Sequence, residues 1–248
     1  MTTMFTRLYG CLFAALLVFA PLEVVAEPFT YSAKEIRGQV VDDATGAPLE
    51  GAVIVAQWQL SQVIKGWKQD SDDALKTIEA VTDKEGKYVI PGWGPKLRPL
   101  TKHLEHYDPL LCIFKSGYYP ARKSNEILSK HNMNSLRTSQ WDGQVIRLKR
   151  FTGKPEGKQM GPMGTLINVW DSTLEEYTTY ISHMQTRLGW GRDKFNWKSM
   201  PHMVIALKKE RERLASEGLD PKYNSIDSIS PQYGSEEIVE EFLKGYEQ

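Results

Sequence analysis

The feature that most constrains the fold is a change in the period of the apolar residues beyond residue 150. Up to that point the chain carries short β-rich runs separated by turn-forming residues. Beyond it, apolar residues recur at spacings of three and four, as on one face of a helix: Trp170, Leu174, Tyr177, Ile181, Met184 and Leu188. The sequence therefore predicts an α+β protein with a β-rich half followed by a helical half.

The β-rich half, residues 27–150, holds seven candidate strands. They are Gly38–Asp42, Ala52–Trp58, Thr77–Thr82, Lys87–Ile90, Leu110–Lys115, Tyr118–Lys123 and Gln144–Arg150. Seven short strands with turn signals between them predict a seven-stranded antiparallel β-sandwich. The turn residues Asp83–Gly86 predict a hairpin in which Gly86 has a positive φ.

The helical half, residues 165–248, follows a linker rich in Gly and Pro at 151–164, which predicts a loop or hinge. We expect a first helix from Ser172, with a stop at Gly189. Ser199 and Pro201 mark the start of a second helix that runs to about Ser216, and a third covers Glu236–Lys244. Short helices of this kind are expected to pack on each other or on the sandwich.

The N-terminus, residues 1–26, has the pattern of a signal peptide. Arg7 precedes the apolar run Leu8–Ala20, and Val24 and Ala26 place small residues before a cleavage site between Ala26 and Glu27. Thirteen apolar residues are too few to span a bilayer as a helix, which favours a leader over an uncleaved anchor. We therefore expect an exported protein, periplasmic or secreted, with no membrane span in the mature chain.

Three motifs in the β-rich half carry a resemblance to a known family. They are Gly38–Val53 with its Thr-Gly-Ala-Pro turn, Thr82–Pro91, and Phe114–Tyr118. Together, over about residues 36–150, they resemble the carboxypeptidase regulatory-like domain, a transthyretin-like (prealbumin-like) β-sandwich. Residues 59–76 and 93–108 depart from the family's compact form, as inserted polar segments. The resemblance implies a sandwich fold and a usually non-catalytic role, and it implies no reaction.

The sequence holds none of the common catalytic motifs, and we assign no catalytic, cofactor-binding or metal-binding residue. None of the five histidines has Glu three residues later, as a zinc carboxypeptidase would require. The best metal candidate is the pair His103 and His106 with Asp108, which could face one ion if the segment were helical. It would support a small metal-dependent hydrolase, but we favour a solvated loop there. The acidic run Asp70–Asp73 lacks the pattern of an EF-hand calcium loop.

Aromatic and charged residues leave the choice of partner open. Four tryptophans, Trp67, Trp93, Trp190 and Trp197, lie in predicted loops and could stack on sugars, although structural roles are more common. A formal net charge of zero removes the simplest argument for a nucleic-acid partner. In the second helix, basic residues alternate with Glu210 and Glu212, which predicts a solvated face. Cys112, the only cysteine after the leader, is expected to be buried.

These observations lead to one functional expectation and two alternatives. We expect an exported, non-catalytic binding or structural accessory protein of the cell envelope, with a protein partner and no cofactor. The inserted segments and the helical half would form its contact surface. The alternatives are a carbohydrate-binding module that uses the loop tryptophans, and the metal-dependent hydrolase at His103 and His106.

Overall fold

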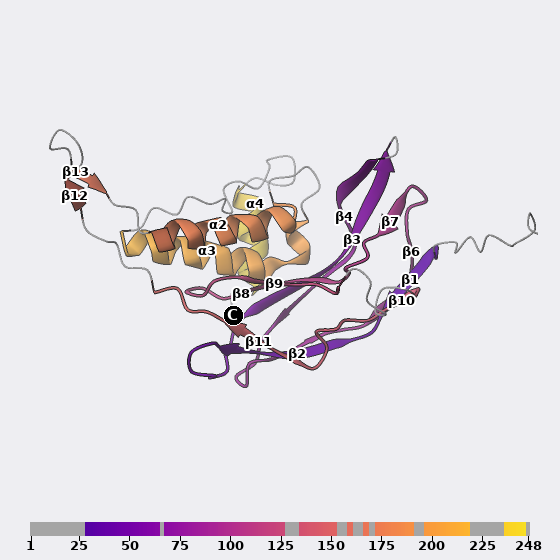
Figure 1. Cartoon of the computed structure of the whole chain (residues 1–248), viewed down its shortest axis with the longest axis horizontal. Helices are drawn as coiled ribbons and strands as arrows, with labels where there is room; N and C mark the ends of the chain where they lie inside the picture. The colour runs from indigo at the N-terminus through magenta and orange to yellow at the C-terminus, as the bar shows by residue number, and fades with distance from the viewer. Residues whose placement is uncertain are drawn as a thin grey trace, which may run out of the picture.

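The chain folds into small β-sheets with helices packed against one of them (Figure 1). This computed structural model describes residues 28–64, 67–126, 134–152, 158–160, 166–168, 172–190, 196–218 and 236–246. The predicted leader, with its cleavage site at Ala26 and Glu27, lies outside the described residues. The α+β class predicted from the sequence is confirmed.

The largest sheet has five strands and a long hairpin at one edge. Its strands are β3 (Val53–Ile64), β4 (Trp67–Val81), β7 (Lys102–Leu104), β8 (Leu110–Phe114) and β9 (Ala121–Lys123). Their order is β4-β3-β8-β9, and β7 pairs with the far end of β3. All pairings in this sheet are antiparallel.

Two three-stranded sheets complete the β-rich half. One has the order β11-β2-β5, from Gln144–Leu148, Ile36–Asp42 and Lys87–Ile90. The other has the order β10-β1-β6, from Leu136–Arg137, Thr30–Ala33 and Trp93–Leu97. The pairs β11–β2 and β1–β10 are parallel. The prediction of seven antiparallel strands is therefore wrong in number, because short strands outside the seven candidate runs also pair, and wrong in direction, because two of the candidate runs, β2 and β11, pair in parallel.

Three helices follow, as predicted. They are α2 (Ser172–Arg187), α3 (Pro201–Ser216) and α4 (Glu236–Leu243), with 3-10 turns η3 (Trp197–Ser199) and η6 (Lys244–Tyr246). Within the described residues, none of them is long and apolar enough to cross a bilayer. The linker is not only a loop, because β12 (Lys158–Met160) lies in it and pairs with β13 (Leu166–Asn168).

The central strands β3 and β8 are buried on both faces, which explains how the two halves pack. Alternate side chains of a strand point to opposite faces. Ile54 and Ile113 join one apolar cluster with the small sheets, whereas Val55 and Cys112 join a second cluster with the three helices. The helices therefore share a core with the sheet, as Figure 1 shows from the position of α2 and α3 over β8 and β9.

The two segments that depart from the family's compact form contain strands. Residues 59–64 and 67–76 lie in the β3–β4 hairpin, whose register runs from Val53 opposite Val81 to Ile64 opposite Trp67. Residues 93–108 contain β6 and β7, which pair with β1 and β3. Cross-strand hydrogen bonds override the polar composition, since an edge strand needs only one apolar face.

The turn at Asp83–Gly86 does not join two paired strands. Gly86 has the predicted positive φ, at 70°, and its N–H donates to the carbonyl of Asp83 at 2.9 Å. However, β4 pairs with β3 and β5 pairs with β2. The predicted hairpin is therefore wrong, and the turn carries the chain from one sheet to another.

Candidate binding groove

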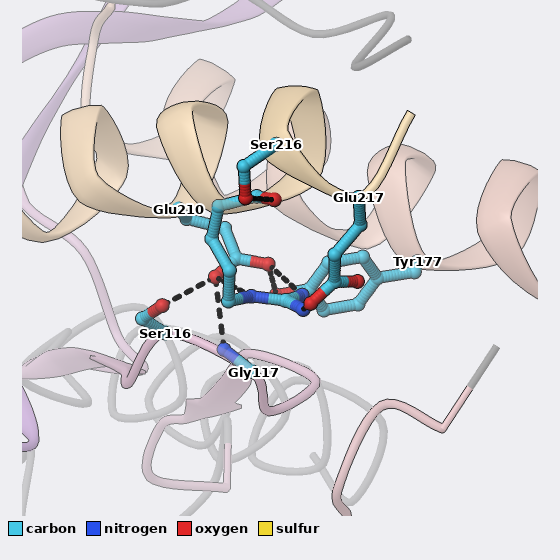
Figure 2. Close-up of polar contacts among 7 residues, drawn as sticks. Ser116, Gly117, Tyr177, Glu210, Ser216 and Glu217 are labelled. Carbon is cyan, nitrogen blue, oxygen red and sulfur yellow. Dashed lines mark hydrogen bonds and ion pairs between the residues drawn. The ribbon is translucent and has the colours of Figure 1, made fainter. Parts of the chain in front are cut away.

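A buried carboxylate fixes the helices to the sheet. Glu210 of α3 has no exposed surface, and its Oε2 accepts hydrogen bonds from Ser116 Oγ at 2.5 Å and the Gly117 N–H at 2.9 Å, in the turn after β8. Its Oε1 accepts one from the Tyr177 hydroxyl of α2 at 2.7 Å. Figure 2 shows these side chains converging on Glu210. The helix positions are thus set by a charge-assisted network as well as by apolar packing.

Arg213, one turn along α3, supplies the counter-charge. Its Nη2 donates to Oε1 of Glu210 at 2.6 Å, and its Nη1 donates to Glu217 at 2.7 Å. The hydrogen bond to Glu210 is the main reason that the pKa of Arg213 is raised. The predicted solvated face is therefore wrong at Glu210, although Glu212 is exposed.

A second carboxylate holds the start of α3 against the hairpin. Glu79 of β4 accepts hydrogen bonds from the N–H groups of His202 at 2.9 Å and Met203 at 2.6 Å, so it caps the helix from another element. Ser199, predicted to mark this start, forms part of η3, and the N-cap is Met200, which makes no side-chain cap bond. Burial raises the pKa of Glu79, and its hydrogen bonds to His202 and Met203 partly oppose that shift.

Beside this cap lies a groove between the β-rich half and the helices. It consists of two hollows, of about 510 and 470 Å³, that share Lys76, Thr77 and Ser199 in their walls. Volumes of this size are typical of ligand sites. We call the two hollows together the groove, the first its wide end and the second its cationic end.

The cationic end brings together three basic side chains from three elements. Lys76 comes from β4, Lys198 from η3 and His202 from α3. The Lys198 amine also lies over the rings of Trp197 and Phe242, at 5.4 and 5.9 Å from their centroids. The one carboxylate among the described lining residues is Glu79, whose side chain is 6% exposed and already bound to α3. Glu79 also lies 2.8 Å from Nδ1 of His202, so the charges available to an anionic ligand are those of Lys76 and Lys198.

The wide end is mostly polar at its surface and lies over buried aliphatic residues. Its walls include four side chains that are almost fully buried: Leu60, Leu75, Leu188 and Met200. At the rim, Leu97 of β6 lines the hollow with 72% of its surface exposed. Lys96 also lines this end, and its amine donates to the carbonyl of Leu75 at 2.5 Å. Because the four aliphatic side chains are almost fully buried, Leu97 is the main apolar side chain exposed at this end, and most of the surface there is polar.

The metal candidates do not meet in one site. His103 lies in β7 opposite Ser61, and His106 is exposed in the turn that follows, so the segment is not helical as the candidate required. Asp108 points into the protein, where Oδ1 accepts the N–H of Gln59 at 3.0 Å. Over the described residues, no three His, Cys, Asp or Glu side chains are grouped to hold a metal ion.

Two of the four tryptophans predicted to lie in loops are buried. Trp190 and Trp197 are 3% and 1% exposed. Trp93 lies in β6 and packs edge-to-face on Trp58, with ring centroids 5.1 Å apart. Trp67 lies in β4, and its side chain and those of Asp70–Asp73 are outside the described residues. Trp190 and Trp197 are therefore packing groups, whereas Trp93 is half-buried and also lines the cationic end of the groove.

Cys112 is buried, as predicted. It faces the helices from β8, and burial raises the pKa of its thiol to about 12. A thiol held in its neutral form is a poor nucleophile. Cys112 is therefore a packing residue.

Sequence reasoning missed the groove residues. Lys76, Lys198 and His202 are far apart in the chain and belong to no motif. The signal that could have found them is indirect, because Lys76 stands in the segment that departs from the compact family pattern. Only the docking of α3 on β4 brings the three together.

Comparison with known proteins assigns no family. No family model matches the chain, and no curated protein matches it. Distant likenesses to β-sandwich structures include a streptococcal ancillary pilin, 12% identical over 48% of this chain and 30% of the pilin, with a TM-score of 0.24. The major plantain pollen allergen Pla l 1 is 14% identical over 51% of this chain and 98% of the allergen, with a TM-score of 0.25. Catechol 1,2-dioxygenase from Pseudomonas arvilla is 16% identical over 60% and 69%, with a TM-score of 0.27. The chain thus spans less than a third of the pilin.

Proposed function

We propose that this is an exported, non-catalytic binding protein whose groove holds an anionic ligand. The observation that carries the proposal is the convergence of Lys76, Lys198 and His202 at one end of the groove. Each comes from a different element, so only the assembled fold creates the site. The N-terminal pattern with its cleavage site at Ala26 and Glu27 supports export.

Much of the groove comes from the segments that depart from the family's compact form, 59–76 and 93–108, and from the helical half. β4 contributes Lys76, β6 contributes Leu97, and η3 and α3 contribute the helical wall. A regulatory-like sandwich carrying a binding site in its added segments is consistent with the non-catalytic role that the resemblance implies. The ligand would then be an anion displayed on, or released from, the cell envelope.

A thermal-shift assay with a panel of anions tests this proposal. An anion that binds the folded chain raises its melting temperature, and above the Kd the rise grows with the logarithm of the ligand concentration. We expect carboxylates or phosphates to raise it in the natural chain and not in the Lys76→Met/Lys198→Met variant. Lys84→Met, which changes an exposed lysine outside the groove, is the matched control. An equal response in all three chains would overturn the assignment to the groove.

Truncation of residues 165–248 is not a suitable test. The helices share an apolar cluster with Val53, Cys112 and Phe114, and their removal would expose it. Substitutions in the groove leave that cluster intact, because Lys76 and Lys198 are not part of it.

A further inference from the structure

Both hollows of the groove run along the edge of one strand. Consecutive residues of β4 line them, with 74–77 at the wide end and 76–79 at the cationic end. β4 is an edge strand of the five-stranded sheet, and within the described residues no strand pairs with its outer side. The side walls come from β6 on one side and from η3 and the start of α3 on the other. The groove therefore contains an open sheet edge.

The backbone groups of Thr77 and Glu79 point outward from this edge. In an antiparallel pair, residues whose N–H and C=O groups bond to the partner strand alternate with residues whose groups point away. The N–H of Thr82 donates to the carbonyl of Ala52 at 2.9 Å, and the β3–β4 register runs without a shift from there to Lys76. Even-numbered residues in this part of β4 therefore bond to β3, whereas Thr77 and Glu79 direct their N–H and C=O groups away from it.

Lys96 shows that the outer edge of β4 takes a further donor. Its amine, from β6, donates to the carbonyl of Leu75 at 2.5 Å, in the place that a backbone N–H of an added strand would occupy. This contact closes the edge at Leu75. Thr77 and Glu79 remain, each with one backbone donor and one acceptor for an added strand.

The two lysines lie on opposite sides of this edge. Lys76 stands opposite Trp58 of β3, on the face that packs against the small sheets, whereas Lys198 comes from η3 on the helical side. Neighbouring residues of an extended chain point to opposite faces. Two adjacent acidic residues in an added strand would thus direct one carboxylate toward each lysine.

We propose that the ligand is an acidic peptide segment in extended conformation, which adds to the edge of β4 as a further strand. Main-chain hydrogen bonds to Thr77 and Glu79 hold its backbone, and Lys76 and Lys198 bind an adjacent pair of Asp or Glu side chains. The mostly polar surface of the wide end suits a peptide backbone. This inference rests on the proposed function, because it assigns a chemical class to the anion held in the same groove.

Calorimetric titration with the hexapeptide Thr-Val-Glu-Glu-Val-Thr, acetylated and amidated, tests the inference. Alternate backbone N–H groups of an added strand face β4 and the others face away. The peptide is therefore N-methylated at its second and fourth residues, or at its third and fifth. One of these sets should weaken binding about tenfold or more, and the other should leave it almost unchanged. The Gln-Gln version should bind about tenfold more weakly, because both ion pairs are lost.

Thr77 provides a matched pair of protein variants. Thr77→Pro removes the outward N–H, and an edge strand tolerates proline where that N–H faces away from the sheet. We expect this variant to lose hexapeptide binding and to keep phosphate binding, since both lysines are unchanged. Thr77→Val keeps the N–H and the shape of the side chain, and should bind both. The methylated peptides test the same pairing on the natural chain, whether or not Thr77→Pro folds.

The outcomes separate this inference from the proposed function. If phosphate binding depends on Lys76 and Lys198 but the hexapeptide does not bind, the anion site stands and the added strand is wrong. If the hexapeptide binds and its two methylated sets respond alike, it does not pair with β4 and the inference is overturned. If neither phosphate nor the hexapeptide binds, both are wrong.

Discussion

Nδ1 of His202 lies 2.8 Å from Oε2 of Glu79, within hydrogen-bond distance. The same carboxylate caps α3, so the imidazole at the cationic end is positioned by the contact that holds the helix to the hairpin. Helix docking and groove geometry therefore depend on one residue.

Replacement of Glu79 should loosen this contact. Glu79→Ala removes the acceptor for the N–H groups of His202 and Met203, and we expect the free energy of unfolding to fall by about 1 to 2 kcal/mol. Urea denaturation measures the change. Glu85→Ala, an exposed glutamate in the turn before β5, should have almost no effect. Equal losses in the two variants would contradict the capping role.

Glu210 should matter more than any exposed glutamate of α3. Glu210→Gln leaves Arg213 without its buried counter-charge and disrupts the bonds to Ser116 and Tyr177, so we expect a loss of about 3 kcal/mol. Glu212→Gln, on the same helix and exposed, should change stability by less than about 0.5 kcal/mol. Guanidinium unfolding of both variants gives the comparison. If Glu210→Gln were as stable as Glu212→Gln, the network would not hold the helices.

The stability contribution of Asp42 should depend on acid pH. The N–H of Thr45, with smaller contributions from the Tyr118 hydroxyl and others, lowers the pKa of Asp42 to about 2. A carboxyl whose pKa is lower in the folded state stabilises the fold above its unfolded value of 3.8, and this stabilisation is lost as pH falls toward 2. The difference in unfolding free energy between the natural chain and Asp42→Asn should therefore shrink over that range. A difference that stays constant from pH 6 to pH 2.5 would be evidence against it.

Two glycines with the same backbone angle should tolerate alanine differently. Gly86 and Gly46 have φ of 70° and 71°, where any L-residue is strained by about 1 to 2 kcal/mol. A Cβ on Gly86 would also lie 2.5 Å from the carbonyl oxygen of Val40, whereas a Cβ on Gly46 meets nothing within 4 Å. Gly86→Ala should thus be clearly the more destabilising in thermal melts. The reverse order would show that the turn differs from the one described.

The thiol of Cys112 should be protected in the folded protein. It has no exposed surface, and burial raises its pKa to about 12, so little thiolate exists at pH 8. Mass spectrometry should find Cys112 unmodified after treatment with iodoacetamide, and fully modified once urea is added. Rapid alkylation without denaturant would mean that the helices do not cover β8.

The helices were predictable because their signals are local. Pro201, and the glycines at 189 and 218, set boundaries through their own backbone preferences. The sheets were less predictable, because pairing depends on strands distant in the chain. Nothing local to Gln144–Leu148 indicates that it runs parallel to β2.

The groove was the least predictable feature. Nothing in the sequence distinguishes Lys198 from other lysines. Its place in the groove depends on the docking of the helices beside Lys76. In the sequence, Glu210 is one of several charged residues that alternate in sign along the second helix. Its role follows only from the hydrogen bonds that Ser116 and Tyr177 donate to it. Pair contacts of this kind carry no signal in a single sequence.

The most direct test of the binding groove is an amide NMR titration with inorganic phosphate. We expect the chemical-shift changes to concentrate at Lys76, Thr77, Ser199 and His202, which border the cationic end and its junction with the wide end. Changes concentrated elsewhere, such as in the β11-β2-β5 sheet, or the absence of saturable changes would contradict the account.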